Sequence, residues 1–346
     1  MIQVLPVDAA TREQYSHYVA AHPQARFGHD LAWAEVLRDT YGVESEHLIA
    51  LEDGKVVGIC PLFLCRPLLG GAHYQTSLFP SYFGPLYDSE RALNEILDAL
   101  MKKTSALQYA EILSPVSLPA DERLPYFETL DYTYRLPLND SPEKIFSNFR
   151  RNYRRILKDR RFYDEVELIV DTKGELTRQF YRLYAGLYAR KHGFIPHIEK
   201  LFHNIFAYYP NGAARIYMAR SHGKYIAGIF TFWTHGEAYC GWSALDLKTE
   251  YLPMHFLIWK IIQDGLGENY RWFNHGEAPA GHESLKLFKQ GWNMAPAETF
   301  RYFMPGRLTK PNVRLYDRFS WTKRLVSALP SRVTSAFLSP LIRYVL

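Results

Sequence analysis

Hydrophobic and polar positions change their period several times along this chain, and the changes predict alternating helices and strands. Apolar residues at helical spacing occupy residues 12–21, 31–40, 89–107, 175–207 (with a break at 192–196) and 253–266. Apolar or alternating runs that predict strands occupy residues 2–7, 47–65, 73–79, 109–113, 214–234, 238–243 and 270–274. This mixture predicts an α/β protein in which helices flank mixed, mostly antiparallel sheets.

One β-hairpin pattern occurs twice. Apolar runs flank Asp53-Gly54 in the first copy and His222-Gly223 in the second, and such turns favour a tight hairpin. The two turn glycines are 169 positions apart (223 minus 54), and the second copy reads as one residue longer after the turn. A strand, a loop, a helix and a strand follow each hairpin, which predicts an internal duplication.

The stretch 141–162 combines an apolar face with a basic face. Ser141 is a predicted N-cap and Pro142 a predicted first helical residue. On a helical wheel, Phe149 and Tyr153 lie with the other apolar residues, opposite the arginines. We therefore predict one basic helix that opens the second half of the chain.

Positive charge is concentrated in this stretch. Residues 150–161 contain seven basic residues and one acidic residue, a net charge of +6, whereas the whole chain carries +5. The remaining residues therefore sum to −1. A merely solvated helix face mixes charge signs, so this face favours an anionic partner such as phosphate, nucleic acid or membrane headgroups.

Length and cysteine content restrict the class of protein. A chain of 346 residues is long for one core and predicts two domains. Cys60, Cys65 and Cys240 have neither metal-binding nor disulfide spacing, so we expect no metal site and a cytoplasmic location. The N-terminal residues have no signal-peptide pattern, and no apolar run is long enough to span a bilayer.

The order of these elements resembles the GNAT acyltransferase unit, and two such units joined by a basic segment resemble the FemAB family. The matching stretches are Tyr41-Gly42, DGKVVGICPL, SYFGPLYD, FRRNYRRILK, LYARKHGFIP, HGKYIAGIF and FNHGEAPAGHESLKLFKQGWN. The end of the chain is similar to FemAB-related proteins of exopolysaccharide and exosortase systems. The resemblance implies GNAT-like units at residues 1–141 and 142–306, followed by an amphipathic helical tail at 307–346.

The resemblance also implies a reaction. An aminoacyl or acyl group would pass from aminoacyl-tRNA or acyl-CoA to an amine on a phosphate-bearing peptidoglycan or polysaccharide precursor, with no tightly bound cofactor. Such a site needs a proton acceptor, donors for an oxyanion and a phosphate-binding surface. The glycine-rich pyrophosphate loop of GNAT proteins is absent from residues 248–257 and 81–92, which counts against ordinary coenzyme A binding.

Candidate catalytic residues cluster near the end of the second half. Lys289 matches a family lysine that neutralises developing charge, and we expect its replacement by alanine to lower turnover without affecting folding. Glu277 is a candidate proton acceptor, although residues 274–277 depart from the family's Asp-Phe-Gly-Arg, and His282 is a weaker candidate. The strand around Gly241 would offer backbone N–H groups to the acyl carbonyl. Candidate substrate-binding residues are Arg150, Arg154, Arg155, Lys286, Trp242, Ser243 and Tyr82, with Trp242 also suited to a core position.

Two alternatives remain open. One is a coenzyme A-dependent N-acyltransferase that acts on a sugar nucleotide or exopolysaccharide precursor. The other is a non-catalytic scaffold of polysaccharide assembly at the inner membrane face, because cationic residues alternate with apolar ones in the tail. The tail residues that suggest it are Trp321, Lys323, Arg324, Phe337 and Arg343. The sequence shows no Cys-His or Ser-His-Asp order typical of a covalent nucleophile.

Overall fold

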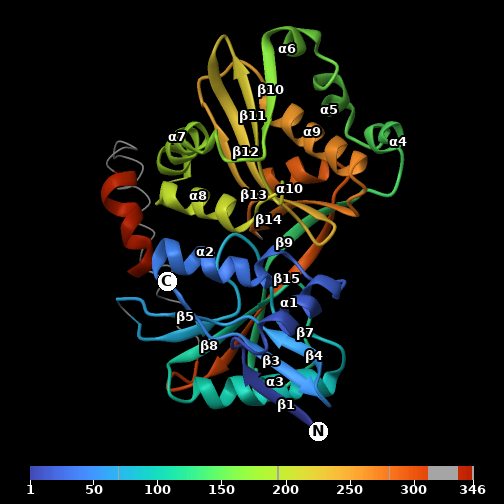
Figure 1. Cartoon of the computed structure of the whole chain (residues 1–346). Helices are drawn as coiled ribbons and strands as arrows, with labels where there is room; N and C mark the ends of the chain where they lie inside the picture. Colours follow the sequence, from blue (N-terminus) through green and yellow to red (C-terminus); the bar gives the residue numbers. More distant parts are fainter. Residues whose placement is uncertain (69, 193–194, 280, 311–333, 345–346) are drawn as a thin grey trace. The chain divides into compact units, whose positions relative to one another are not determined.

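The computed structural model describes the chain except for residues 69, 193–194, 280, 311–333 and 345–346 (Figure 1). Its internal contacts divide the chain into two units. Among described residues, unit 1 comprises 1–131, 298–310 and 341–344, and unit 2 comprises 132–297 and 334–340. Trp321, Lys323 and Arg324 of the predicted tail lie outside the described residues. Within the described parts of the chain, no helix has the length and apolar character needed to cross a membrane.

Unit 1 contains two sheets. The first is antiparallel and has the order β1-β3-β4-β7. Its strands are β1 (Ile2–Pro6), β3 (Leu48–Glu52), β4 (Lys55–Cys60) and β7 (Leu86–Tyr87). The second has the order β15-β8-β6-β5-β2, with a parallel β6–β8 pair. Its strands are β15 (Ala295–Pro305, in unit 1 from residue 298), β8 (Tyr109–Ser114), β6 (His73–Gln75), β5 (Phe63–Cys65) and β2 (Glu44–Ser45).

Helices cover both faces of the first sheet of unit 1. The helices of this unit are α1 (Arg12–Ala21), η1 (Phe27–His29), α2 (Leu31–Tyr41) and α3 (Glu90–Thr104). Ser89 caps α3 by accepting a hydrogen bond from the Ala92 amide at 3.2 Å. The apolar stripe of α3, including Leu93 and Ile96, is buried against β1, β3 and β4. Each such side chain contributes about 1.5–3 kcal/mol through burial, so the helical period predicted from the sequence fixes this packing.

Unit 2 is built on five strands in the order β10-β11-β12-β13-β14, and the other edge of β14 pairs with β9. Its strands are β10 (Val166–Asp171), β11 (Ala214–Ser221), β12 (Lys224–Thr234), β13 (Glu237–Leu245) and β14 (Trp272–Pro279). The pair β13–β14 is parallel and the other pairs are antiparallel. Strand β9 (Tyr126–Pro137) begins in unit 1, and its residues from 132 onward belong to unit 2. This mixed, mostly antiparallel architecture confirms the predicted fold class.

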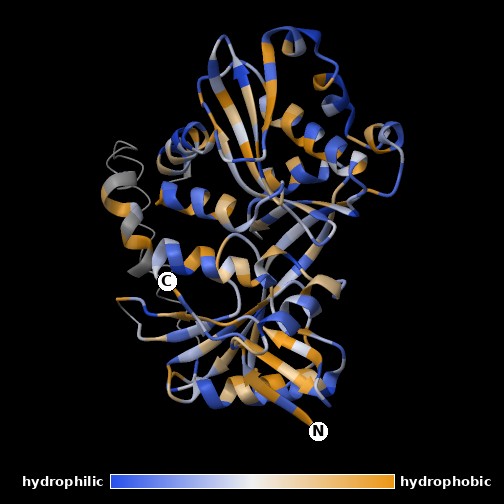
Figure 2. Ribbon diagram, viewed as in Figure 1, coloured by the Kyte–Doolittle hydropathy of each residue, from blue (hydrophilic) through white to orange (hydrophobic). Residues whose placement is uncertain are grey.

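Two helical layers enclose the sheet of unit 2 (Figure 1). Helix α9 (Pro253–Gly267) packs its apolar side chains, among them Phe256 and Ile261, into the core that contains Tyr217 and Trp233. On the opposite face, Phe202 of α8 (Glu199–Tyr208) contacts Phe230 of β12 at 5.4 Å between ring centroids. Figure 2 shows hydrophobic residues along these central strands and along α9. The remaining helices of the second half are α4 (Pro142–Ser147), α5 (Arg151–Ile156), α6 (Arg160–Glu165), α7 (Thr177–Leu187), η2 (Tyr188–His192), α8 (Glu199–Tyr208), α9 (Pro253–Gly267), α10 (Glu283–Gln290), η3 (Thr334–Leu338) and η4 (Ser339–Tyr344).

The prediction of one continuous basic helix at 141–162 is wrong. The segment forms three short helices, α4, α5 and α6, with an extended backbone at Arg150 (ψ 140°) and at Asp159 (ψ 107°). The breaks have local causes, since the Arg150 amide bonds the Gly291 carbonyl at 2.8 Å and Asp159 caps α6. The predicted apolar face is confirmed, because Phe149 and Tyr153 are buried in the core of unit 2.

The two predicted hairpins are equivalent. Lys55 and Lys224 each begin the second strand after a turn in which both central residues have positive φ. Each hairpin has one β-bulge, after Ala50 in β3 and after Ala219 in β11, and these positions are 169 apart. Gly58 pairs with Ala50, and Ala227 pairs with Ala219 at the same spacing. The extra residue expected in the second copy is therefore absent.

Candidate active site

The parallel strands β13 and β14 separate within unit 2. They pair from Glu237 with Trp272 to Tyr239 with Asn274, and beyond that register the described residues show no pairing. At the same point β13 contains a bulge, because Cys240 and Trp242 pair with successive residues of β12 and leave Gly241 out. A bulged residue is left out of the regular pairing, so the backbone N–H of Gly241 is the candidate donor on this strand. The wedge between the strands thus begins at the bulge.

Strand β14 turns sharply on its side of the wedge. Gly276 has φ +72°, and a Cβ there would lie 3.3 Å from the Cys240 carbonyl oxygen. Its amide donates to the Asn274 side chain at 2.9 Å, and Asn274 also accepts a bond from Thr133 at 3.2 Å. A side chain at position 276 would therefore face both backbone strain and crowding, which explains the glycine.

Lys289 of α10 holds this turn from behind. Its side chain is 2% exposed, and its ammonium donates to the carbonyls of His275 (2.9 Å), Gly276 (2.9 Å) and Glu277 (2.8 Å). An ammonium has three protons, so these three bonds use its full donor capacity. Removing it would leave three carbonyls without their donor, so the expectation that alanine leaves folding unaffected does not fit this geometry.

The Glu277 carboxylate lies on β14 beside the hydroxyl of Tyr239 on β13. Tyr239 donates to Glu277 Oε2 at 3.0 Å. Tyr239 is buried, yet its hydroxyl reaches the candidate proton acceptor. Burial, with the nearby Lys289 charge, lowers the pKa of His275 to about 3, so its imidazole is neutral at pH 7.

The basic segment docks onto the same part of unit 2. The Tyr153 hydroxyl donates to the Phe288 carbonyl on α10 at 3.1 Å, and the Tyr153 ring lies 4.7 Å from the His255 ring. His255 belongs to the first turn of α9, which has no side-chain cap. Helix α5 therefore lies beside α10 and the start of α9, close to the elements that form the wedge.

Several arginines of this segment have no protein partner. Among the described residues, the side chains of Arg150, Arg154 and Arg155 make no ion pair and no hydrogen bond, and Arg154 Nε is buried. Arg161, by contrast, pairs with Glu165 at 3.3 Å. Like charges without counter-ions repel one another, so these side chains are suited to an external anion.

The other predicted residues have more ordinary environments. His282 precedes α10 and is exposed, and Lys286 pairs with Glu283 at 2.8 Å. Trp242 is buried against Phe202 at 5.2 Å, which is a core position. The remaining two are Ser243, half-buried on β13 beyond the bulge, and Tyr82, half-buried in the loop of unit 1 before β7.

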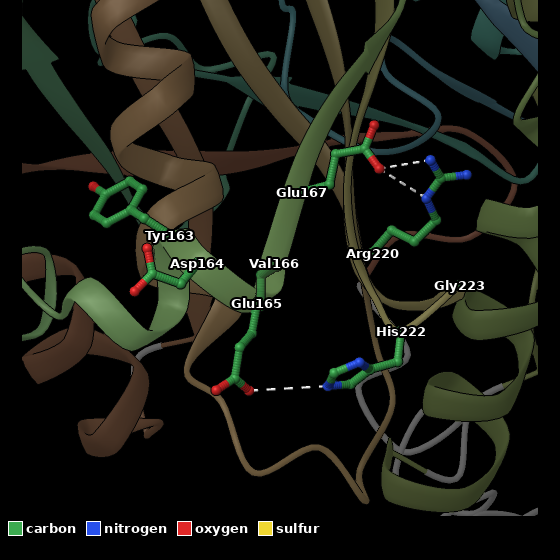
Figure 3. Close-up of a pocket in the computed structure, with 8 residues that line it drawn as sticks. All are labelled: Tyr163, Asp164, Glu165, Val166, Glu167, Arg220, His222 and Gly223. Carbon is green, nitrogen blue, oxygen red and sulfur yellow. Dashed lines mark hydrogen bonds and ion pairs between the residues drawn. The ribbon is translucent and has the colours of Figure 1, made fainter.

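A separate pocket of about 400 Å³ lies in unit 2 between α6, the start of β10 and the β11–β12 turn (Figure 3). Arg220 in this pocket pairs with Glu167 at 2.5 Å, and His222 Nε2 lies 3.9 Å from Glu165. No residue predicted for the active site lines it. Its charged side chains Arg220, Glu167, His222 and Glu165 pair with each other as described. Its residues are Tyr163, Asp164, Glu165, Val166, Glu167, Arg220, His222 and Gly223.

The cysteines do not offer a nucleophile. Burial raises the pKa of Cys60 and of Cys65 to about 12, and it raises that of Cys240 as well. A thiol in such surroundings stays protonated and unreactive. Across the described residues, no group of three or more His, Cys, Asp or Glu side chains is arranged to hold a metal ion.

Comparisons with known proteins agree with this geometry. Residues 147–286, within unit 2, match the acetyltransferase (GNAT) domain family. The fold is similar to the crystal structure of FemX, with a TM-score of 0.69 and 15% identity over 91% of this chain and 99% of that chain.

Two further solved structures share the fold. One is the C-terminal domain of a putative lysylphosphatidylglycerol synthetase from Agrobacterium fabrum, with TM-score 0.57, 16% identity, and coverage of 86% of this chain and 93% of that chain. The other is a tandem GNAT protein from the clavulanic acid biosynthesis pathway, with TM-score 0.52, 12% identity, and coverage of 88% and 98%. The sequence has no match among curated proteins. Residues 147–286 are thus similar to the acetyltransferase (GNAT) domain family, in a chain whose fold is similar to that of a tandem GNAT protein, and this similarity supports a transferase.

Proposed function

We propose that unit 2 is the catalytic unit of a transferase that moves an aminoacyl or acyl group onto an amine of a phosphate-bearing cell-envelope precursor. The observation that carries this proposal is the separation of β13 from β14 at the Gly241 bulge. One of the similar structures is named as a putative lysylphosphatidylglycerol synthetase, and that name describes a product in which an amino acid is attached to a phospholipid. This supports a phosphate-bearing envelope component as the substrate class. A peptidoglycan or polysaccharide precursor is the acceptor we favour, in the cytoplasm where its charged donors are made.

The wedge supplies the groups that such a transfer needs. The acceptor amine attacks the donor carbonyl carbon, a C–N bond forms, and the carbonyl electron pair moves onto oxygen. The backbone N–H at Gly241 stabilises that oxyanion, because a fixed dipole needs no reorganisation during the reaction. The amine proton passes to the Glu277 carboxylate, which the Tyr239 hydroxyl holds in place, and the C–O or C–S bond to the donor then breaks.

Arg150, Arg154 and Arg155, at the start of and within α5, supply in this proposal the charge that a phosphate-bearing substrate requires. Helix α5 lies beside the first turn of α9 through the contact of Tyr153 with His255, and the guanidinium groups bind the anion. In this proposal they bind the phosphate that a glycine-rich loop binds in GNAT proteins, since residues 248–257 do not contain that loop. Lys286 and Ser243 extend this surface in our proposal, and His282 remains a secondary candidate.

Lys289 acts in this proposal as a positioning residue. Its ammonium is bound to three carbonyls of β14 and fixes the turn that presents Glu277 to the wedge. It also places a positive charge behind the carbonyl groups of that turn. Its effect on transfer therefore passes through the strand and not through contact with the substrate.

Donor binding tests this proposal. Thermal unfolding of the full chain is followed while aminoacyl-tRNA, uncharged tRNA or acetyl-CoA is titrated, since a ligand that binds the folded state raises the melting temperature. We expect stabilisation by aminoacyl-tRNA and transfer of the labelled aminoacyl group to a precursor amine. Stabilisation by acetyl-CoA alone would favour the coenzyme A-dependent alternative. A chain that binds neither donor would contradict a transferase function and return attention to the scaffold alternative.

A further inference from the structure

Arg26 of unit 1 is a buried cation without a counter-ion. Its residue is 8% exposed, and no carboxylate among the described residues lies within ion-pair distance of it. Its guanidinium makes two hydrogen bonds, from Nη1 to Ser81 Oγ and to the Tyr82 carbonyl, both at 3.5 Å. We propose that Arg26 is the centre of a carboxylate-binding site in unit 1, independent of the transfer site proposed for unit 2.

The surroundings of Arg26 are fixed by several bonds. His29 Nδ1 accepts from the Arg26 amide at 3.0 Å, and His29 Nε2 donates to the Phe83 carbonyl at 2.7 Å. His29 Nδ1 also lies 3.3 Å from the Arg26 carbonyl oxygen, so the ring holds the Arg26 backbone from one side. The Phe83 amide donates to Ser77 Oγ at 2.6 Å.

The loop that faces Arg26 is anchored further by packing. The Trp33 indole donates to the Leu78 carbonyl at 2.9 Å. A Cβ at Gly28 would lie 2.0 Å from the Phe83 ring, so only glycine allows this approach. The loop at residues 77–84 is thus held in place before any ligand binds, and a preformed site loses less entropy on binding.

The unused edge of the guanidinium matches a carboxylate. Nε and Nη2 donate to no described residue, and together they form the edge that binds both oxygens of a carboxylate. One carboxylate also balances one buried positive charge, whereas a phosphate dianion would leave an excess negative charge buried. Since an unpaired buried charge is strongly unfavourable, the site gains most from a ligand with a single charge.

Arg123 shows what a fully paired arginine of unit 1 looks like. Its side chain is 14% exposed, and it donates to Asp121 at 2.8 Å and to Asp98 at 2.6 Å. It also bonds both the carbonyl and the side chain of Asn94, at 2.9 Å and 2.7 Å. Arg26 has similar burial but none of these anionic partners, so the missing partner is the feature that distinguishes it.

The test uses acetate as the probe and the full-length chain. The parent protein is melted in sodium acetate and in sodium chloride of equal ionic strength at pH 7. We expect acetate to raise the melting temperature by about 2 °C at tenfold excess over its Kd. We also expect the ¹H–¹⁵N signal of Arg26 Nε, identified by its loss in Arg26→Met, to move with acetate in the parent protein.

Two variants separate a ligand site from a structural arginine. Arg26→Met should melt at or above the parent temperature without acetate, because an unpaired buried charge is removed, and its response to acetate should vanish. Arg123→Met should melt several degrees lower and keep the acetate response. The proposal is overturned if Arg26→Met melts as low as Arg123→Met, if the Arg26 Nε signal ignores acetate, or if inorganic phosphate matches the effect of acetate.

Discussion

The two copies of the hairpin have the same register, but the elements that follow them differ. Beyond β12, unit 2 places the long strand β13 (Glu237–Leu245) next to the parallel strand β14, and the two then separate. Beyond β4, unit 1 has the three-residue strands β5 and β6 and the two-residue strand β7, and β6 pairs in parallel with β8 over two residue pairs. The parallel pair of unit 2 spans three residue pairs and is followed on β13 by the bulge at Gly241.

The helices after the two hairpins differ in a related way. Helices α3 and α9 both span 15 residues, but Ser89 caps α3 whereas Leu252 gives α9 no side-chain cap. The start of α9 instead has Pro253, which carries no N–H, and a hydrogen bond from the His255 amide to the Leu252 carbonyl at 3.1 Å. The two copies therefore share the hairpin but differ in how the following helix begins, and it is the bulged copy in unit 2 that we propose as the site of chemistry.

The largest expected effect comes from removing the anchor of the wedge. Lys289→Met should lower stability by about 3–5 kcal/mol, because three buried carbonyls lose their donor. Turnover should fall at least about a hundredfold, since the Glu277 turn is no longer held. Urea unfolding and a transfer assay measure the two effects. Lys286→Met on the same helix, where the pair with Glu283 is near the surface, should cost much less stability. Equal stability of both variants would contradict the claim that Lys289 stabilises the β14 turn.

Acid should weaken both units, because each contains buried histidines with lowered pKa values. Burial lowers the pKa of His197 to about 3 and that of His255 to about 4, and His275 behaves like His197. In unit 1, burial lowers the pKa of His47 to about 4. The pKa values of His22 and His73 are also lowered by burial, although less strongly.

A histidine that is neutral when folded takes up a proton on unfolding once the pH falls below its unfolded pKa of about 6.5. The stabilisation is complete above that pH and is lost, at about 1.4 kcal/mol per pH unit and histidine, as the pH falls toward the folded pKa. Between pH 7 and pH 5, amide hydrogen exchange should show a loss of protection of at least about 1.4 kcal/mol in unit 2. Protection in unit 2 that does not change with pH would contradict the neutral state of its histidines.

The arginines of the basic segment in unit 2 should bind a phosphate-bearing ligand. Changing Arg150 and Arg154 together to Gln should lower affinity for inorganic pyrophosphate about tenfold and reduce its dependence on salt. Stability should hold or rise slightly, because repulsion between like charges is relieved. Calorimetric titration at two salt concentrations measures the change. Arg161→Gln is the matched control, because Arg161 is already paired with Glu165, and it should bind as the parent does. Unchanged affinity in the double variant would exclude the phosphate-binding role.

The smallest expected effect tests the equivalence of the two hairpins. Gly54 and Gly223 have φ of 79° and 76°, and a Cβ at either would meet nothing within 4 Å. Alanine at either position should therefore cost about 1 kcal/mol through backbone strain alone. Urea unfolding of the two single variants should give the same loss within error. A clear difference would show that the two turns are held by different surroundings.

The sequence by itself determined the elements and their duplication. Turn chemistry at Asp53-Gly54 and His222-Gly223, and apolar periodicity in α3 and α9, are local signals that do not depend on distant partners. They predicted the mixed α/β class and the equivalence of the hairpins. The long strands β9 and β15 were not predicted, because their partners lie far away in the chain.

Tertiary structure decided where the basic segment breaks, which side chains are buried and which charges are paired. These features depend on contacts between residues that are distant in the chain. The break of the basic segment arises where Arg150 meets the Gly291 carbonyl, and a helical wheel cannot show that contact. The burial of Lys289 depends on β14 supplying three carbonyls, and a sequence motif gives only its position near Glu277. Whether an arginine is paired, as Arg123 is, or lacks a carboxylate partner, as Arg26 does, is likewise fixed only when the chain has folded around it. Local propensity selects helix or strand, whereas desolvation and pairing of polar groups are set by packing.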